Sequence, residues 1–151
     1  MPPEIWLDRA ARVEKMASWR VTSTPGTRYE YPPTAVHWVI AEIIDRVTGD
    51  DYRRVVTQRI SAPLGLSFRL GVPPAEQGDI ATIELRGEPA TAEEYQAALG
   101  IPGIDVGEVT DDALEAFNRP DFREAGVPGG GGVGTAADLA MYYQALLAQY
   151  I

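Results

Sequence analysis

The chain has 151 residues and carries 22 acidic against 13 basic side chains, a formal net charge of −9 with histidine neutral. This excess of negative charge argues against nucleic acid and against an anionic membrane as partners, because both attract clustered Lys and Arg. There is no cysteine, so neither a disulfide framework nor a thiolate metal site can form.

The first predicted elements are helices separated by Pro- and Gly-rich connections. Residues 4–19 predict a helix in which several apolar side chains share one face. After a turn-rich connection, a short aromatic strand is expected around Tyr29 and Tyr31. The strongest helical pattern then begins at Thr34, a suitable N-cap, and ends at Gly49. The apolar residues expected on the inner faces are Trp6, Ala10, Val13 and Ala17, followed by Val36, Val39, Ile40, Ile43, Ile44 and Val47.

The middle of the chain predicts shorter elements. Asp50 is expected to cap a helix that ends at Pro63. Strand-like alternation follows at residues 66–72 and 80–85, with prolines and Gly78 separating the two runs.

Three further helices are predicted from their N-caps. Thr91 with Glu94 forms a capping box for a short helix that Gly100 ends, and Thr135 with Asp138 forms another for the last helix. The fold class is therefore mainly α, with a few short strands. The third helix is expected to start at Thr110 or Asp111 and to run through Phe117, with an interruption at Pro120. The expected inner stripe of the last helix is Leu139, Tyr142 or Tyr143, Leu146 and Leu147.

Two segments carry motifs of a known family. Residues 25–66 read PGTRYEYPPTAVHWVIAEIIDRVTGDDYRRVVTQRISAPLGL, with a Gly-Thr-Arg turn, an aromatic segment and two helices, the second ending in Pro-Leu-Gly. Residues 129–147 read GGGGVGTAADLAMYYQALL, a Gly-rich loop before a helix that starts with Thr-Ala-x-Asp-Leu. Together they resemble serine β-lactamase-type hydrolases, a family that also contains penicillin-binding proteins and esterases. The resemblance implies the helical domain of the α/β β-lactamase and penicillin-binding-protein-like fold, without the half that holds the main antiparallel sheet.

The Ser-x-x-Lys motif that carries the nucleophile of this family has no match. Lys15 is the only lysine, and no serine has a lysine three positions later. The Lys-Thr-Gly or His-x-Gly strand of the family is also missing. The resemblance therefore implies that residues 1–151 are a single domain and a fragment of a larger serine hydrolase, inactive alone. The parent reaction would be acyl transfer from an amide or ester to serine, then to water.

Tyr31 is the candidate catalytic residue. In the family, a Tyr-x-Asn motif supplies a tyrosine that acts as general base during acylation, and alignment on the Pro-Gly-Thr turn at residues 25–27 puts Tyr31 there. Pro33 then replaces the asparagine, which removes an amide contact with substrate. This departure favours an esterase or peptidase-like parent over a β-lactamase. The alternative interpretation is that Tyr29 and Tyr31 are packing residues on a short strand.

His37, the only histidine, lies in the first turn of the helix that follows Tyr31. We expect it to be packed or hydrogen-bonded, and a place at the mouth of the substrate cleft is the alternative. No cofactor and no metal are predicted. The acids of this region match no calcium loop and are expected on a solvated face: Glu42, Asp45, Asp50 and Asp51.

The run Gly129 to Gly134 matches Gly-x-Gly-x-x-Gly letter for letter. A dinucleotide-binding loop needs a strand before it and an acidic residue about 20 positions later, and a P-loop needs lysine where Thr135 stands. We expect instead a close-packed turn that leads into the capped helix. At the border of a cleft, its glycines would allow the backbone to approach closely.

Two hypotheses from different classes remain open. In the first, this is the helical domain of a serine hydrolase, and its partner is the remaining α/β half of the parent. An exposed apolar docking face is then expected, which would also permit a homodimer. In the second, the chain is a free-standing, non-catalytic helical module for binding or assembly, and the same face would be polar. Without a signal peptide or an apolar run of about 20 residues, the default expectation is a cytoplasmic protein.

Overall fold

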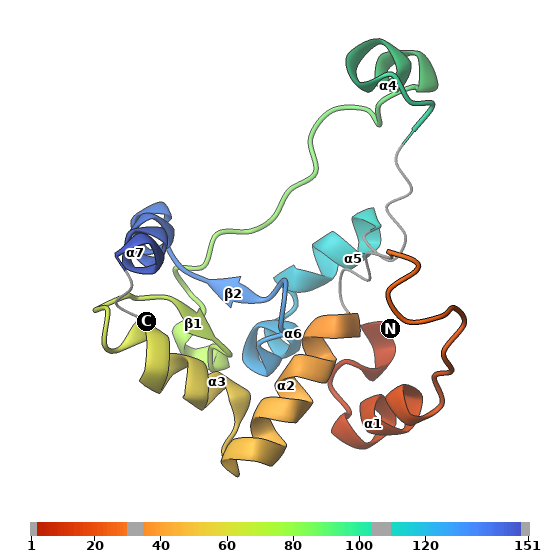
Figure 1. Cartoon of the computed structure of the whole chain (residues 1–151). Helices are drawn as coiled ribbons and strands as arrows, with labels where there is room; N and C mark the ends of the chain where they lie inside the picture. Colours follow the sequence, from red (N-terminus) through yellow and green to blue (C-terminus); the bar gives the residue numbers. More distant parts are fainter. Residues whose placement is uncertain (1–2, 30–34, 104–109, 149–151) are drawn as a thin grey trace.

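The computed structural model describes residues 3–29, 35–103 and 110–148. The chain is mainly helical with one small sheet, as the sequence predicts (Figure 1). The turns and helices are η1 (Pro3–Ile5), α1 (Arg9–Ala17), α2 (Ala35–Thr48), α3 (Tyr52–Val56), η2 (Thr57–Ser61), η3 (Pro74–Glu76), α4 (Ala92–Leu99), α5 (Asp111–Glu115), η4 (Ala116–Asn118), α6 (Pro120–Ala125) and α7 (Ala136–Leu147), and the strands are β1 (Arg69–Leu70) and β2 (Gly132–Val133).

The described part of the chain has one antiparallel strand pair, β1 with β2. β1 is the core of the strand predicted over 66–72. It ends at Leu70, because Gly71 has a positive φ of 80° and the Val72 N–H then donates to the Arg123 carbonyl of α6 at 2.8 Å. β2 was not predicted, since glycine is disfavoured in strands. The register pairs Arg69 with Val133 and Leu70 with Gly132.

One other strand prediction is wrong, and the structure describes another only in part. Residues 80–85 form no strand; instead the Asn118 side chain accepts from the Ile83 N–H and donates to the Ile83 carbonyl, both at 2.8 Å. An amide side chain thus satisfies the backbone where a neighbouring strand would. Tyr29 lies in no strand and is 85% exposed, while Tyr31 lies outside the described residues.

The first helix is shorter than predicted. The Asp8 carboxylate accepts a hydrogen bond from the Ala11 N–H at 3.0 Å and so caps α1. Trp6 therefore precedes the helix and is buried, whereas Ala10 and Ala17 are exposed. The predicted common face is wrong, because one helical frame does not extend back to Trp6.

Helices α2 and α7 form where predicted but bury a different face. The buried residues are Trp38 and Ala41 on α2, and Asp138 and Ala145 on α7. Both helices are apolar on more than one side, so periodicity could not identify the inner one. Much of the predicted inner stripe is exposed, by 40% to 80% on α2: Val36, Ile40, Ile43 and Val47 there, and Leu139, Tyr143, Leu146 and Leu147 on α7.

Most predicted caps are present. In the capping box of α4, the Glu94 N–H donates to Thr91 Oγ1 at 3.2 Å and the Thr91 N–H donates to the Glu94 carboxylate at 2.8 Å. Gly100 ends this helix in the left-handed conformation. Thr110, one of the two predicted starts, caps α5. Short polar side chains at these positions satisfy N–H groups that the helix leaves free.

Two boundaries differ from the prediction. Asp51 rather than Asp50 caps α3, accepting from the Arg53 N–H at 2.9 Å, and the helix continues through the π-helical turn η2. Pro120 begins α6 instead of interrupting a helix. Its fixed φ and missing N–H suit the first helical position.

The core joins aromatic side chains from distant parts of the chain. Trp6 packs against Phe117 and Phe122, with ring centroids 5.8 and 5.4 Å apart. Trp38 meets Tyr52 edge to face at 6.3 Å. Large aromatic rings dominate the burial energy of a small core, so these contacts hold the N-terminal segment, α2 and α3 against α6.

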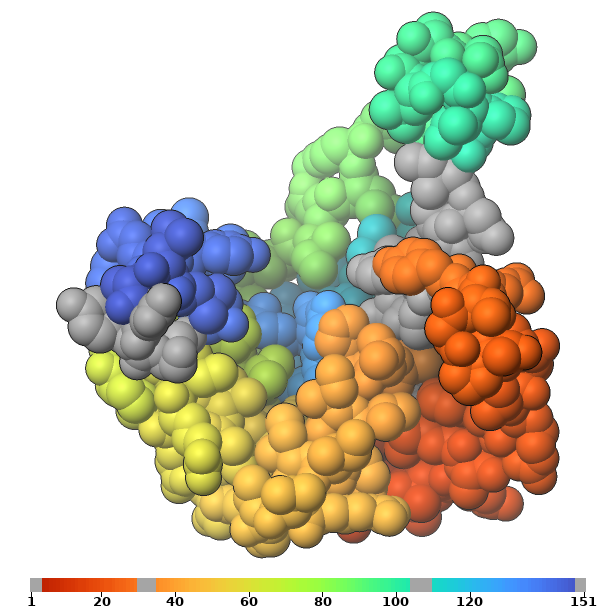
Figure 2. Space-filling model, viewed as in Figure 1, coloured from red at the N-terminus to blue at the C-terminus, as the bar shows by residue number. Residues whose placement is uncertain are grey.

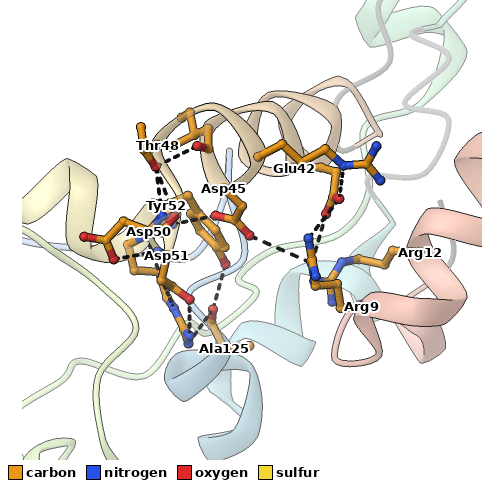
Figure 3. A network of polar contacts seen from close by, with 12 residues as sticks. Arg9, Arg12, Glu42, Asp45, Thr48, Asp50, Asp51, Tyr52 and Ala125 are labelled. Carbon is orange, nitrogen blue, oxygen red and sulfur yellow. Dashed lines mark hydrogen bonds and ion pairs between the residues drawn. The ribbon is translucent and has the colours of Figure 1, made fainter.

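Carboxylates on α2 connect this helix to α1 and α3 (Figure 3). Arg9 Nη2 donates to the Glu42 carboxylate at 2.9 Å, and Asp45 accepts from the Tyr52 N–H at 2.7 Å. The second bond fixes the start of α3, because this N–H belongs to the first helical residue and has no partner within the helix.

A tight junction connects α3, β1 and the end of α6. The Tyr52 hydroxyl donates toward the carbonyl oxygens of Ala125 and Gly126, 2.9 and 3.0 Å away (Figure 3). Burial raises the pKa of Tyr52 to about 12, so this donor stays protonated. Gly126 has φ +63, and a Cβ there would lie 2.3 Å from the Gly71 nitrogen.

Helix α4 stands clear of the rest of the molecule (Figure 2). It lies within residues 84–103, which follow the bonds between Ile83 and Asn118 and project from the body (Figure 1). An eight-residue helix of which no residue is buried is marginal in water, so the capping box and Gly100 matter for its persistence. Across the described ranges, no helix combines the length and apolarity needed to cross a bilayer.

The junction predicts a difference between two left-handed glycines. Gly126→Ala should lower the free energy of unfolding by about 3 kcal/mol or more, because backbone strain adds to a clash with β1. Gly65 has nearly the same φ, +64, but open space around its Cβ position. Gly65→Ala should therefore lose only about 1 kcal/mol, from strain alone. Urea unfolding of the two variants checks this, and equal losses would mean that the junction is not close-packed.

Candidate functional site

The two family-like segments meet at His37. This residue lies in the first turn of α2, and its ring packs on the backbone of Gly129. A Cβ at Gly129 would lie 2.5 Å from His37 Cγ and Nδ1. The expected packed position of His37 is thus present, and it lies at the Gly-rich loop. Tyr31 and Pro33, the other predicted site residues, lie outside the described residues.

The glycines of the loop are packed against protein atoms. A Cβ at Gly130 would lie 2.6 Å from the Phe117 ring, and one at Gly132 would lie 2.7 Å from the Phe68 ring. A Cβ at Gly131 would lie 2.7 Å from the Val127 nitrogen. The loop is therefore a close-packed turn, and at these positions glycine makes room for neighbouring side chains and backbone.

Asp138 fixes the helix that follows the loop. Its carboxylate accepts from the Thr135 N–H at 2.8 Å, which completes the predicted capping box. It also accepts from the Ser67 hydroxyl at 2.6 Å and from the Ser67 N–H at 2.8 Å. These bonds hold the pKa of Asp138 well below its usual range, and the bond from the Ser67 hydroxyl contributes most to this lowering. They anchor the start of α7 to the segment after η2.

Two cavities flank the loop. One, of about 330 Å³, lies between the loop, Phe117 and the segment from Asp79 to Ile83, with Arg123 in its wall. The other, of about 460 Å³, is apolar and lies between η2, β1 and α7. Within the described ranges, no group of three or more His, Asp or Glu side chains is arranged to hold a metal ion.

Several residues that shape this region were not identified from the sequence. Phe68, just before β1, and Phe117, in η4, support the loop, and their only sequence signal is that they are large and apolar. Ser67 gave no signal, because its partner Asp138 lies 71 positions away. Arg123 also looks like an ordinary helix residue, and only the fold brings it to a cavity wall.

The Asp138 bonds predict a pH-dependent contribution to stability. A carboxylate with a lowered pKa stabilises the folded state above its unfolded pKa of about 3.9, and this contribution is lost as the pH falls through the folded-state pKa. Asp138→Asn should therefore unfold at lower urea than the unmodified chain at pH 7, and the difference should shrink below about pH 4. Asp79→Asn, at an exposed carboxylate, is the matched control and should show no such difference. A pH-independent loss in Asp138→Asn would contradict the prediction.

A protein-family model described as Beta-lactamase matches residues 1–150. A search of curated proteins finds no match. Among solved structures, the chain is similar to EstA from Arthrobacter nitroguajacolicus Rue61a, with a TM-score of 0.64 and 23% sequence identity. The similarity covers 96% of this chain and 38% of EstA, so the chain spans well under half of that protein's length. At this identity the likeness establishes a shared fold. Because the family model matches nearly the whole sequence, this chain belongs to the Beta-lactamase family.

Proposed function

We propose that the chain forms one wall of the active-site cleft of a serine hydrolase, as the helical domain of a larger protein. An ester or amide would acylate a serine outside this chain, and water would then release the acid. The observation that carries the proposal is the contact between His37 and Gly129. It joins the start of α2, which follows Tyr31 in the sequence, to the Gly-rich loop. Both family-like segments therefore lie at this contact.

Within this proposal, Tyr31 acts as the general base. Its phenolate would take the proton of the attacking serine hydroxyl and pass it to the leaving group. Lysines of the missing half would lower its pKa, since this chain has only Lys15. Pro33 and His37 are cleft residues. Pro33 offers no side-chain amide to a substrate, and this favours esters or peptides over β-lactams.

The exposed apolar faces of α2 and α7 support the helical-domain role. Val36, Ile40, Ile43 and Val47 lie at spacings of three to four residues, so they form one continuous stripe on α2. Exposed apolar stripes of this kind mark interaction surfaces. We propose that the α/β half of the parent protein covers them, and the same face would be available for a homodimer when that half is absent.

The alternative function is a free-standing binding or assembly module. Its expected signature is a polar surface where the α/β half would dock. The apolar residues on α2 and α7 therefore favour the hydrolase domain over the free-standing module.

The first prediction of this proposal concerns the 151-residue chain alone. It should form no covalent adduct with penicillins or activated esters, because none of its four serines has a lysine one helical turn away. Ser67 does contact a carboxylate, but the lowered pKa of Asp138 makes it a weak base. Intact mass after incubation is the measurement, with a known serine hydrolase as positive control. Labelling of Ser18, Ser23, Ser61 or Ser67 would overturn the assignment of the nucleophile to another part of the protein.

The second prediction concerns the full-length protein encoded around this segment. Tyr31→Phe should lower kcat/KM for an activated ester by about 10²- to 10⁴-fold, the usual contribution of a general base. Tyr29→Phe is the matched control, because Tyr29 is 85% exposed and close in sequence. Both variants should keep the melting temperature of the unmodified protein. If Tyr31→Phe retains full activity, Tyr31 is a packing residue and the proposed mechanism fails.

A further inference from the structure

The cavity beside the Gly-rich loop combines apolar walls with one cation. Its volume is about 330 Å³, close to the lower end of small-molecule sites. Apolar surface comes from Ile80, Ile83, Phe117 and Val133, and glycine backbone forms one side. The charged groups among its lining residues are Arg123, which is half-buried, and Asp79, which is exposed.

Arg123 has hydrogen-bonding capacity to spare. A guanidinium carries five N–H donors. Arg123 Nε donates to the Phe117 carbonyl at 3.2 Å, and Nη2 lies 3.4 Å from both the Ala81 carbonyl and Asn118 Oδ1. These acceptors are neutral and the distances are long. Within the described structure, Nη1 has no acceptor and no carboxylate lies within ion-pair distance of Arg123.

Several other arginines of this acidic chain are paired with carboxylates, and two of them serve as examples. Arg53 with Asp51 and Arg119 with Asp121 form contacts of 2.7 and 2.6 Å. Arg119 lies immediately before α6, the helix that carries Arg123. The two arginines are therefore close in the chain, but among the described residues only Arg119 is paired with a carboxylate. A half-buried cation without a counter-charge attracts an anion more strongly than an exposed cation does, because screening by water is reduced.

We propose that this cavity binds a carboxylate-bearing acyl group of the substrate, with Arg123 as the residue that selects it. The carboxylate accepts N–H bonds from the free Nη1 side of the guanidinium, and the apolar walls cover the carbon chain. A planar guanidinium suits this role, since it can bind a carboxylate through two parallel bonds. Asp79 at the exposed side weakens the binding of any anion. The inference rests on the proposed function for the meaning of the ligand, but binding itself can be measured without catalysis.

The test is equilibrium binding of hexanoate and of hexan-1-ol to the 151-residue chain, by titration calorimetry at low salt. Hexanoate should bind about tenfold or more tightly than the alcohol, which is the effect of one charge-assisted hydrogen bond. Added salt should reduce this preference. Equal affinities, or no binding of hexanoate, would overturn the inference. Neither result bears on the Tyr31 assay, so the two proposals fail separately.

Three variants locate the interaction. Arg123→Gln should remove the preference for hexanoate, whereas Arg119→Gln, with the same change of charge on an exposed side chain, should keep it. Asp79→Asn should act in the opposite direction and tighten hexanoate binding. This last variant keeps the test decisive if Arg123→Gln does not fold. Equal effects of Arg123→Gln and Arg119→Gln would assign the preference to net charge rather than to this cavity. No gain in Asp79→Asn would mean that the carboxylate does not bind beside Asp79, which would also overturn the inference.

Discussion

The constraint on which the rest of this structure depends is the close approach of Gly126 to the backbone of Gly71. No side chain fits between the two segments, because a Cβ at Gly126 would lie 2.3 Å from the Gly71 nitrogen. Tyr52 closes the junction from α3 with its buried hydroxyl, and the Val72 N–H donates to the Arg123 carbonyl at 2.8 Å. The chain leaves this junction through Val127 into the Gly-rich loop. The position of the loop is therefore set by backbone contact, with little freedom to shift.

The loop itself illustrates how the same glycines serve packing and site geometry together. His37, Phe117 and Phe68 each occupy the space that a Cβ would need at Gly129, Gly130 and Gly132, respectively. Side chains from α2, η4 and the segment before β1 thus converge on one stretch of backbone. This convergence leaves a cavity on one side of the loop, where Arg123 contributes the cation. A single turn thus packs against neighbouring side chains and also borders the cavity that contains Arg123.

The distribution of apolar residues has a common physical meaning across the chain. The buried core is small and rich in aromatic rings, while α2 and α7 keep apolar residues in solvent. Burying one such side chain fully is worth about 1.5 to 3 kcal/mol, so an exposed stripe carries a large unused stabilisation. Exposed apolar stripes of this kind mark interaction surfaces, and this is the observation behind the docking face proposed above.

The sequence by itself determined the family, the mainly helical class and most helix starts, because these depend on local signals. Thr91, Thr110 and Thr135 act as N-caps through bonds to residues three positions away, and such bonds can be recognised from spacing alone. Through one motif it also predicts Tyr31 and Pro33 at the candidate site, and it offers a place at the cleft mouth as the alternative for His37. Of these three residues the described structure includes His37.

Only the tertiary structure decided which face of each helix is buried, which segments form the sheet and which side chains surround the loop. A helix that is apolar on several faces gives no preference until its neighbours are present, and α2 accordingly buries Trp38 while exposing Ile40. The bond between Ser67 and Asp138, and the place of Arg123 in a cavity wall, likewise join segments distant in sequence. Such contacts depend on the packing of the whole chain, and local spacing does not encode them.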